Sequence, residues 1–288
     1  CNFWDICCET IWSMISRQKM RVISLNFPLM FPPPRVSGYI VPGLVSWKHL
    51  RRGIHPSDFY DRLKVLVNYR EMAWDFELEK KAGQVIAHEE YEPWIRFHIR
   101  RERHWFEVAR YLMQTDLCDL TAIIFDGADK LQHICWRLLD PELIPKVLSP
   151  WEQKIRSLCL EYFRQLDSYL AELVTLAGAE ARVFIVSDHG FGPTREVFRV
   201  NAWLYGQGYL KWREICRLDE AGRASLQRRL NSNFVLLDWA KTTAYARTAS
   251  SNGIYIRVAK TGDESGVPIQ VYEAFRQHLM ESLLAFRD

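Results

Sequence analysis

Residues 183–193 read VFIVSDHGFGP, in which four apolar residues lead directly into Asp188 and His189 and then into a glycine-containing turn. A short apolar run bounded by turn residues is typical of a buried strand. A second run of this kind, LTAIIFDG at 120–127, ends in Asp-Gly, and residues 151–178 between the two have the spacing of a long amphipathic helix. Apolar strands separated by long helices predict an α/β fold with a largely parallel central sheet flanked by helices.

Shorter patterns extend this prediction toward the N-terminus. We expect strands within residues 21–28 and 36–47, and a helix over 10–18. The sequence pattern changes over 49–115, where charged residues with the spacing of amphipathic helices dominate. This stretch is therefore predicted to be a helical cap or insertion. At 288 residues the chain suits one large domain with an insertion, and we expect a single α/β catalytic domain over 1–288.

Composition limits the classes of partner and compartment. The chain is 48% hydrophobic and 25% charged, as in an ordinary globular protein, and its net charge of +3 does not argue for nucleic acid. No apolar run reaches the roughly 18 residues that span a bilayer. Seven cysteines without a C-x-x-C pair favour free, mostly buried thiols and a cytoplasmic location. The chain opens on Cys1 and not on Met, which suggests a truncated start. The alternatives to a cytoplasmic location are a lipoprotein and an exported origin. The oligomeric state is left open.

The arginine-rich stretch RFHIRRERHWFEVAR, 96–110, permits two interpretations. It could contact a phosphate-bearing substrate or RNA, since basic and aromatic side chains alternate in it. Such a run is more often a solvated helix face, and that is our expectation. The same interpretation covers most of the histidines outside the two Asp–His motifs, which are His49, His55, His88, His98, His104 and His278.

Two Asp–His pairs follow the two long apolar runs, and ligand sites in open α/β sheets lie outside the carboxyl ends of the strands. Asp129 and His133 are four residues apart and would share a helix face, while Gly190 permits the bend that lets Asp188 and His189 converge. Carboxylate oxygen and imidazole nitrogen suit Zn²⁺ or Mn²⁺. Two such ions about 3.5–4 Å apart can clamp a phosphoryl group. There are two alternatives to metal binding. Asp129 could simply cap its helix, or it could form an ordinary surface pair with His133.

The motifs resemble one known family. IIFDGADKLQHICW is similar to a segment that often reads "TGTDRLQHFFW" in type I phosphodiesterases/nucleotide pyrophosphatases, a branch of the alkaline phosphatase superfamily. FIVSDHGFGPTREVFRVNAWLYGQGYL resembles the "SDHGFG" segment of that branch and its following "N-x-WL…G-L" helix, and two further segments match more loosely. The resemblance implies an alkaline-phosphatase-like sandwich and two divalent ions, commonly zinc, with manganese left possible by the donor chemistry. It also implies a Thr or Ser nucleophile that attacks phosphorus.

By motif, Asp188 and His189 would hold the ion that activates the nucleophile, and Asp129 and His133 would hold the other ion. The implied reaction is hydrolysis of phosphodiester or pyrophosphate bonds in a small phosphate ester, with nucleotide-like compounds among the candidates.

The chain also departs from the family pattern. The first metal Asp and the nucleophile of the family precede the segment where this chain begins, and the last His ligand follows the segment where it stops. Asp5 and His278 are not convincing substitutes, so we expect four of six metal ligands, no catalytic nucleophile and little activity from this chain alone. Asp126-Gly127 stands where relatives often have Thr-Gly, which could alter the local turn. The alternative function is that of an inactive fragment or pseudoenzyme that keeps the fold as a binding module.

Overall fold

The computed structural model describes residues 2–73, 86–213, 236–247, 253–259 and 266–287. The chain divides into two compact units, Cys1–Pro193 and Thr194–Asp288, which are treated separately below. Whether residues 1–288 act as one catalytic domain stays a prediction.

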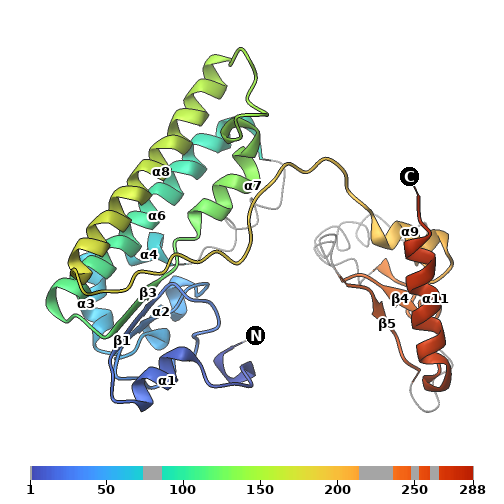
Figure 1. Cartoon of the computed structure of the whole chain (residues 1–288), viewed down its shortest axis with the longest axis horizontal. Coiled ribbons are helices and arrows are strands. Elements are labelled where there is room, and N and C mark those ends of the chain that lie inside the picture. Colours follow the sequence, from blue (N-terminus) through green and yellow to red (C-terminus); the bar gives the residue numbers. More distant parts are fainter. Residues whose placement is uncertain (1, 74–85, 214–235, 248–252, 260–265, 288) are drawn as a thin grey trace. The chain divides into compact units, whose positions relative to one another are not determined.

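The first unit contains a three-stranded sheet in the order β2-β1-β3 (Figure 1). The central strand β1, Val22–Leu25, pairs in parallel over its whole length with β2, Gly38–Val41, and with β3, Leu120–Ile123. All four residues of β1 are buried, as expected for a strand covered on both faces. The predicted strands at 21–28, 36–47 and 120–127 are therefore confirmed, and their carboxyl ends meet at one edge.

Helices cover the two faces of this sheet. The described helices of the first unit are η1 Phe3–Asp5, α1 Ile11–Arg17, α2 Trp47–Gly53, α3 Phe59–Leu66, α4 Tyr69–Met72, α6 His88–Thr115, α7 Gly127–Leu139 and α8 Pro150–Ala177. Ile23 and Leu25 of β1 belong to the cluster that contains Trp105 of α6. Val22 belongs to a different cluster, with Trp12 of α1. Because successive strand residues point to opposite faces, α6 and α1 lie on opposite sides of β1. The predicted α/β fold is confirmed.

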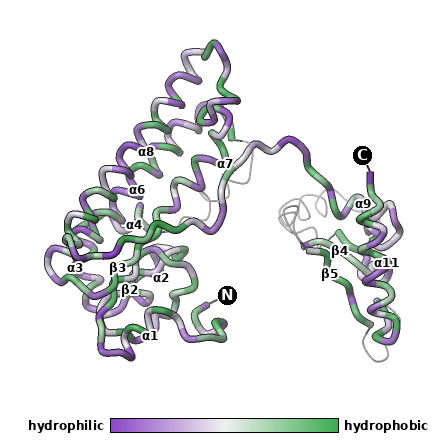
Figure 2. The backbone as a smooth tube through the Cα atoms, viewed as in Figure 1, coloured by the Kyte–Doolittle hydropathy of each residue, from purple (hydrophilic) through white to green (hydrophobic). Residues whose placement is uncertain are grey.

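The two longest helices, α6 and α8, lie side by side (Figure 1). Hydrophobic and hydrophilic residues alternate around both, so each has a face to bury (Figure 2). Local signals set the ends of α8: Ser149 and Glu152 form a capping box, and Gly178 ends the helix with a φ of 90°. The predicted helix over 151–178 is confirmed, and the described part of 49–115 is helical as expected.

Residues 183–187 do not form a strand, so the prediction for Val183 to Ser187 is wrong. Phe184, Ile185 and Val186 are 82%, 81% and 86% exposed, and in Figure 1 residues 179–193 follow α8 without helix or strand. Among the described residues, no strand pairs with this run. A strand forms only where a neighbour bonds to its backbone, and an apolar pattern supplies the propensity but not the pairing.

The second unit is small and mixed. Its described elements are α9 Val200–Gly206, β4 Ala244–Tyr245, β5 Tyr255–Ile256, η5 Ile269–Val271 and α11 Tyr272–Leu284. Strands β4 and β5 pair antiparallel. Leu204 of α9, Ala244 of β4 and Leu279 of α11 share one buried cluster.

The structure also bears on the predictions about thiols and membranes. Cys7, Cys8, Cys118, Cys135 and Cys159 are all unpaired, while Cys1 and Cys216 lie outside the described residues. The expectation of burial holds for Cys135 and Cys159 and is wrong for Cys7 and Cys8, which are exposed. In the part of the chain that the structure describes, no helix has the length and apolar character needed to cross a bilayer.

Two isoleucines test the corrected assignment of the apolar run. Ile23→Ala should lower the free energy of unfolding by about 2–5 kcal/mol, because the side chain is fully buried and its loss leaves a cavity. Ile185→Ala removes the same atoms from a side chain that is 81% exposed, and should change stability by less than about 0.5 kcal/mol. Urea denaturation measures both. Equal losses would show that residues 183–187 are packed as a strand after all.

Candidate metal centre

Asp129 and His133 lie together at the carboxyl edge of the sheet. Strand β3 ends at Ile123, and α7 begins four residues later at Gly127. On this helix the Nε2 atom of His133 lies 3.3 Å from Oδ1 of Asp129, so the predicted shared face is confirmed. The residue at the N-cap of α7 is Asp126, so Asp129 is not the helix cap.

The second motif approaches the same carboxylate. The Nε2 atom of His189 lies 3.6 Å from Oδ1 of Asp129 and 3.8 Å from Oδ1 of Asp188. Asp188 is 92% exposed at its side chain and lies beside His189 at the periphery of the group. The structure therefore brings Asp129, His133 and His189 together and leaves Asp188 at their margin.

An aromatic side chain attaches the second motif to α7. The ring of Phe191 contacts three rings, with centroid distances of 5.0 Å to His133, 5.8 Å to Trp136 and 5.5 Å to His189. His133 and Trp136 both belong to α7, so Phe191 packs the glycine-containing turn against this helix. This packing explains how a segment without secondary structure comes to lie beside Asp129.

The hydrogen bonds of His189 indicate its tautomer. Its Nδ1 atom lies 3.0 Å from the carbonyl oxygen of Gly190, and a carbonyl can only accept, so Nδ1 carries the proton. In the neutral ring the lone pair is then on Nε2, the atom that faces Asp129. The pKa of His189 is raised, first by the hydrogen bond to Gly190 and then by the charges of Asp188 and Asp129.

The donor distances fit the edges of a zinc site. Bonds of about 2.0–2.2 Å to oxygen and nitrogen place two ligands of a tetrahedral zinc about 3.4 Å apart. The two Nε2 atoms lie 3.3 and 3.6 Å from one oxygen of Asp129. Nζ of Lys130 lies 3.4 Å from the other oxygen. Within the described ranges, no three His, Cys, Asp or Glu side chains form a complete metal-binding group. The distances therefore fit pairs of ligands and not a complete site. The assignment of all four predicted ligands stays a prediction.

Comparison with known proteins identifies the family. A sequence model of the type I phosphodiesterase / nucleotide pyrophosphatase family matches residues 1–281, nearly the whole chain. The chain is a member of this family. Searches of curated proteins and of solved structures each gave no significant match. The family consists of hydrolases of the alkaline phosphatase superfamily that act on phosphate esters and are typically metal-dependent.

In this phosphodiesterase-family chain, sequence reasoning missed a buried polar group on α6. Arg101, Glu102 and His98 are only 1–2% exposed, so the expectation of a solvated face over 96–110 is wrong for them. The helical period contained the signal: buried Trp94 and Trp105 lie one turn before His98 and one turn after Arg101, on the same stripe. The abundance of charged residues in this stretch obscures the buried stripe, because its two central members, His98 and Arg101, are themselves ionisable.

The buried group contacts the start of α7. Oε1 of Glu102 accepts hydrogen bonds from the backbone N–H of Gly127 at 2.5 Å and from the hydroxyl of Tyr162 at 3.1 Å. An oxygen of Asp126 lies 3.5 Å from the guanidinium of Arg101. Burial, with the nearby charge of Asp126 second, raises the pKa of Glu102 to about 8. Burial also lowers the pKa of His98 to about 3, which keeps its ring neutral.

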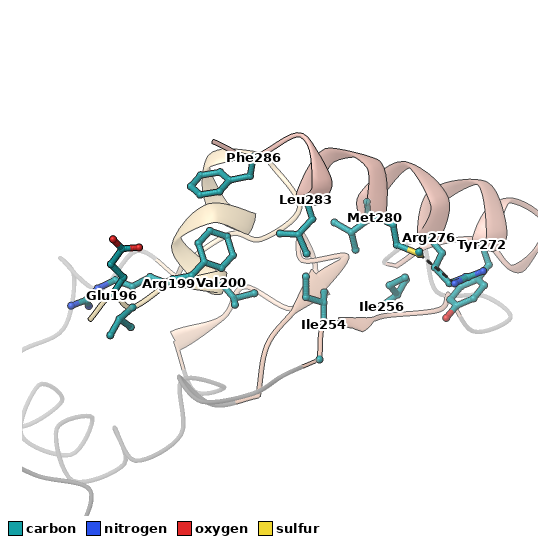
Figure 3. Close-up of a pocket in the computed structure, with 14 residues that line it drawn as sticks. Glu196, Arg199, Val200, Ile254, Ile256, Tyr272, Arg276, Met280, Leu283 and Phe286 are labelled. Carbon is teal, nitrogen blue, oxygen red and sulfur yellow. Dashed lines mark hydrogen bonds between the residues drawn. The ribbon is translucent and has the colours of Figure 1, made fainter. Parts of the chain in front are cut away.

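An open apolar pocket lies within the second unit. Ile254, Ile256, Met280 and Leu283 are among the 14 residues that line it (Figure 3). At its rim Arg276 donates a hydrogen bond to the sulfur of Met280 at 3.4 Å. None of the predicted metal ligands is among the residues that line this pocket.

The raised pKa of Glu102 predicts a pH dependence of stability. Between its ordinary value near 4.5 and about 8, the native state keeps a proton that the unfolded chain has lost, so stability falls as pH rises through this window. Glu102→Gln cannot ionise. The stability of the wild type relative to this variant should therefore fall steadily from pH 5 to pH 8. Urea midpoints measure it, with the exposed Glu142→Gln as control. A difference that does not change with pH would contradict the buried, neutral acid.

Proposed function

We propose that the chain is the metal-binding part of a phosphodiester or pyrophosphate hydrolase, in which Asp129 and His133 bind one divalent ion and Asp188 and His189 bind a second. Zinc is the first choice and manganese the second. One observation carries the proposal: two imidazole nitrogens from separate motifs lie 3.3 and 3.6 Å from one carboxylate oxygen. Family membership supports the reaction class.

Each side chain has a role in holding the ions. His189 offers Nε2, because Gly190 fixes its other nitrogen as a donor. Asp129 lies between His133 and His189, so one carboxylate contacts donors of both motifs. Bound ions would lower the pKa of a Thr or Ser nucleophile and neutralise charge on the phosphoryl oxygens. We take that nucleophile to lie outside the residues of this chain.

The substrate is proposed to be a small phosphate ester, with nucleotide-like compounds as candidates. The helical stretch 49–115 is proposed as the cap that selects it, since its helix α6 packs against α7, which carries Asp129 and His133. A cytoplasmic location is likewise proposed, from the cysteine pattern.

Zinc affinity tests the ligand set directly. Asp129→Asn, His133→Ala and His189→Ala should each weaken zinc binding about tenfold or more, because each removes one donor from an already small set. His278→Ala changes an exposed histidine in the second unit and should leave affinity unaltered. Isothermal titration with zinc chloride measures all four. Unchanged affinity in the three ligand variants would remove the proposed centre.

Hydrolysis of bis(p-nitrophenyl) phosphate tests the reaction class. We expect slow turnover by the 288-residue chain, abolished by a chelator, restored by zinc and absent in His189→Ala. Turnover that survives the chelator would contradict the metal-dependent reaction. Rapid zinc-dependent turnover would show that the chain contains its own nucleophile. Zinc-dependent binding of the ester with no turnover would agree with a chain that lacks its nucleophile, whereas binding of the ester that does not depend on zinc would favour the alternative of a binding module.

A further inference from the structure

Helix α7 begins without a cap from its own chain segment. The first N–H groups of a helix have no partner within the helix and need an outside acceptor. Asp126 is the N-cap residue, of a type that often accepts such bonds, but its side chain makes no capping hydrogen bond. Its carboxylate is turned elsewhere, 3.5 Å from Arg101 and within 3.4 Å of the side-chain amide of Asn26.

Glu102 supplies the missing acceptor from another helix. Its Oε1 atom receives the Gly127 N–H at 2.5 Å, across 25 residues of sequence. The Tyr162 hydroxyl, from α8, donates to the same oxygen at 3.1 Å. Glu102 and Tyr162 are both 2% exposed, so water does not compete for this oxygen. Three helices therefore meet at one carboxyl oxygen beneath the first turn of α7.

The close approach depends on the absence of a side chain at residue 127. A Cβ atom built on Gly127 would lie 2.7 Å from Oε1 of Glu102 and 2.7 Å from the hydroxyl of Tyr162. Both neighbours are buried, so a methyl group at residue 127 would force one of these side chains to shift within close-packed surroundings. Gly127 thus serves to let the helix end reach the carboxyl group.

From these contacts we infer that Glu102 is a positioning residue: it caps α7 from α6 and thereby fixes the place of Asp129 and His133 at the sheet edge. Asp129 is two residues beyond the capped amide, in the same first turn. A first turn that frays would move Asp129 away from His133 and His189. The inference rests on the proposed metal function, because positioning matters only if these side chains bind an ion.

The same contacts give a role to Asp126, which stands where relatives often have Thr. Arg101 and Glu102 are neighbours on α6, and one faces Asp126 while the other faces Gly127. Together they bind both residues of the turn that joins β3 to α7. The cap is thus assigned to Glu102, and Asp126 is left to pair with Arg101.

Two measurements on the full chain test the inference. In Glu102→Ala, hydrogen exchange of the peptide that covers residues 124–131 should be about 10- to 100-fold faster, because the buried Gly127 N–H loses its acceptor and is left unsatisfied. Zinc affinity should fall about 10- to 100-fold, as when an outer-shell partner of a metal site is removed. Glu102→Gln keeps an acceptor oxygen and should remain within about threefold of wild type in both.

Two further variants separate positioning from a general loss of stability. Gly127→Ala would stabilise an ordinary helix, but here it should accelerate exchange of the same peptide, because the methyl group displaces Glu102. Leu112→Ala destabilises the core from the same helix α6 and should leave zinc affinity within about threefold.

The outcomes are distinguishable. Wild-type exchange in Glu102→Ala, or equal losses of zinc affinity in Glu102→Ala and Leu112→Ala, would overturn the inference. If zinc binding proves independent of Asp129, the proposed function fails and the positioning role fails with it. The exchange data would still show whether Glu102 caps the helix.

Discussion

The first unit depends on one strand that is buried on both faces. Because β1 pairs in parallel with β2 on one side and β3 on the other, three distant segments must end at the same edge of the sheet. α7 begins at that edge, so the direction of β1 decides where Asp129 and His133 lie. Reversal of either neighbour would place the residues that follow it at the opposite edge.

A carboxyl group in apolar surroundings connects this edge to the helical stretch 49–115. Glu102 lies on the face of α6 that packs toward α7 and α8, and its pKa is raised because burial disfavours the charged form. A buried acid costs stability unless its oxygens are bonded. The Gly127 N–H and the Tyr162 hydroxyl offset part of that cost at Oε1, and the same bonds tie α6 to the helix that carries Asp129. Glu102 therefore links the helix packing of the unit to the position of the proposed metal ligand Asp129.

The sequence predicted whatever depends on neighbours in the chain. The strand at 21–28, the helix at 151–178 with its glycine stop, and the Asp129–His133 pair all follow from local spacing. The strand at 183–187 was predicted wrongly because pairing is a property of two segments, and its apolar pattern describes only one. The bond between Glu102 and Gly127 could not be predicted for the same reason, since these residues lie 25 positions apart, although the helical period of α6 indicates that polar residues on it are buried. The approach of His189 to Asp129 depends on the packing of Phe191 against α7, which no local pattern specifies.

The proposed function requires a divalent ion that binds at the carboxyl edge of β3, beside Asp129. The most direct test is a crystal of the zinc-soaked chain with diffraction recorded at the zinc absorption edge. We expect an anomalous peak within about 2.2 Å of Oδ1 of Asp129 and of an Nε2 atom of His133 or His189. A map whose zinc peaks lie only elsewhere, such as at the exposed thiols of Cys7 and Cys8, would contradict it.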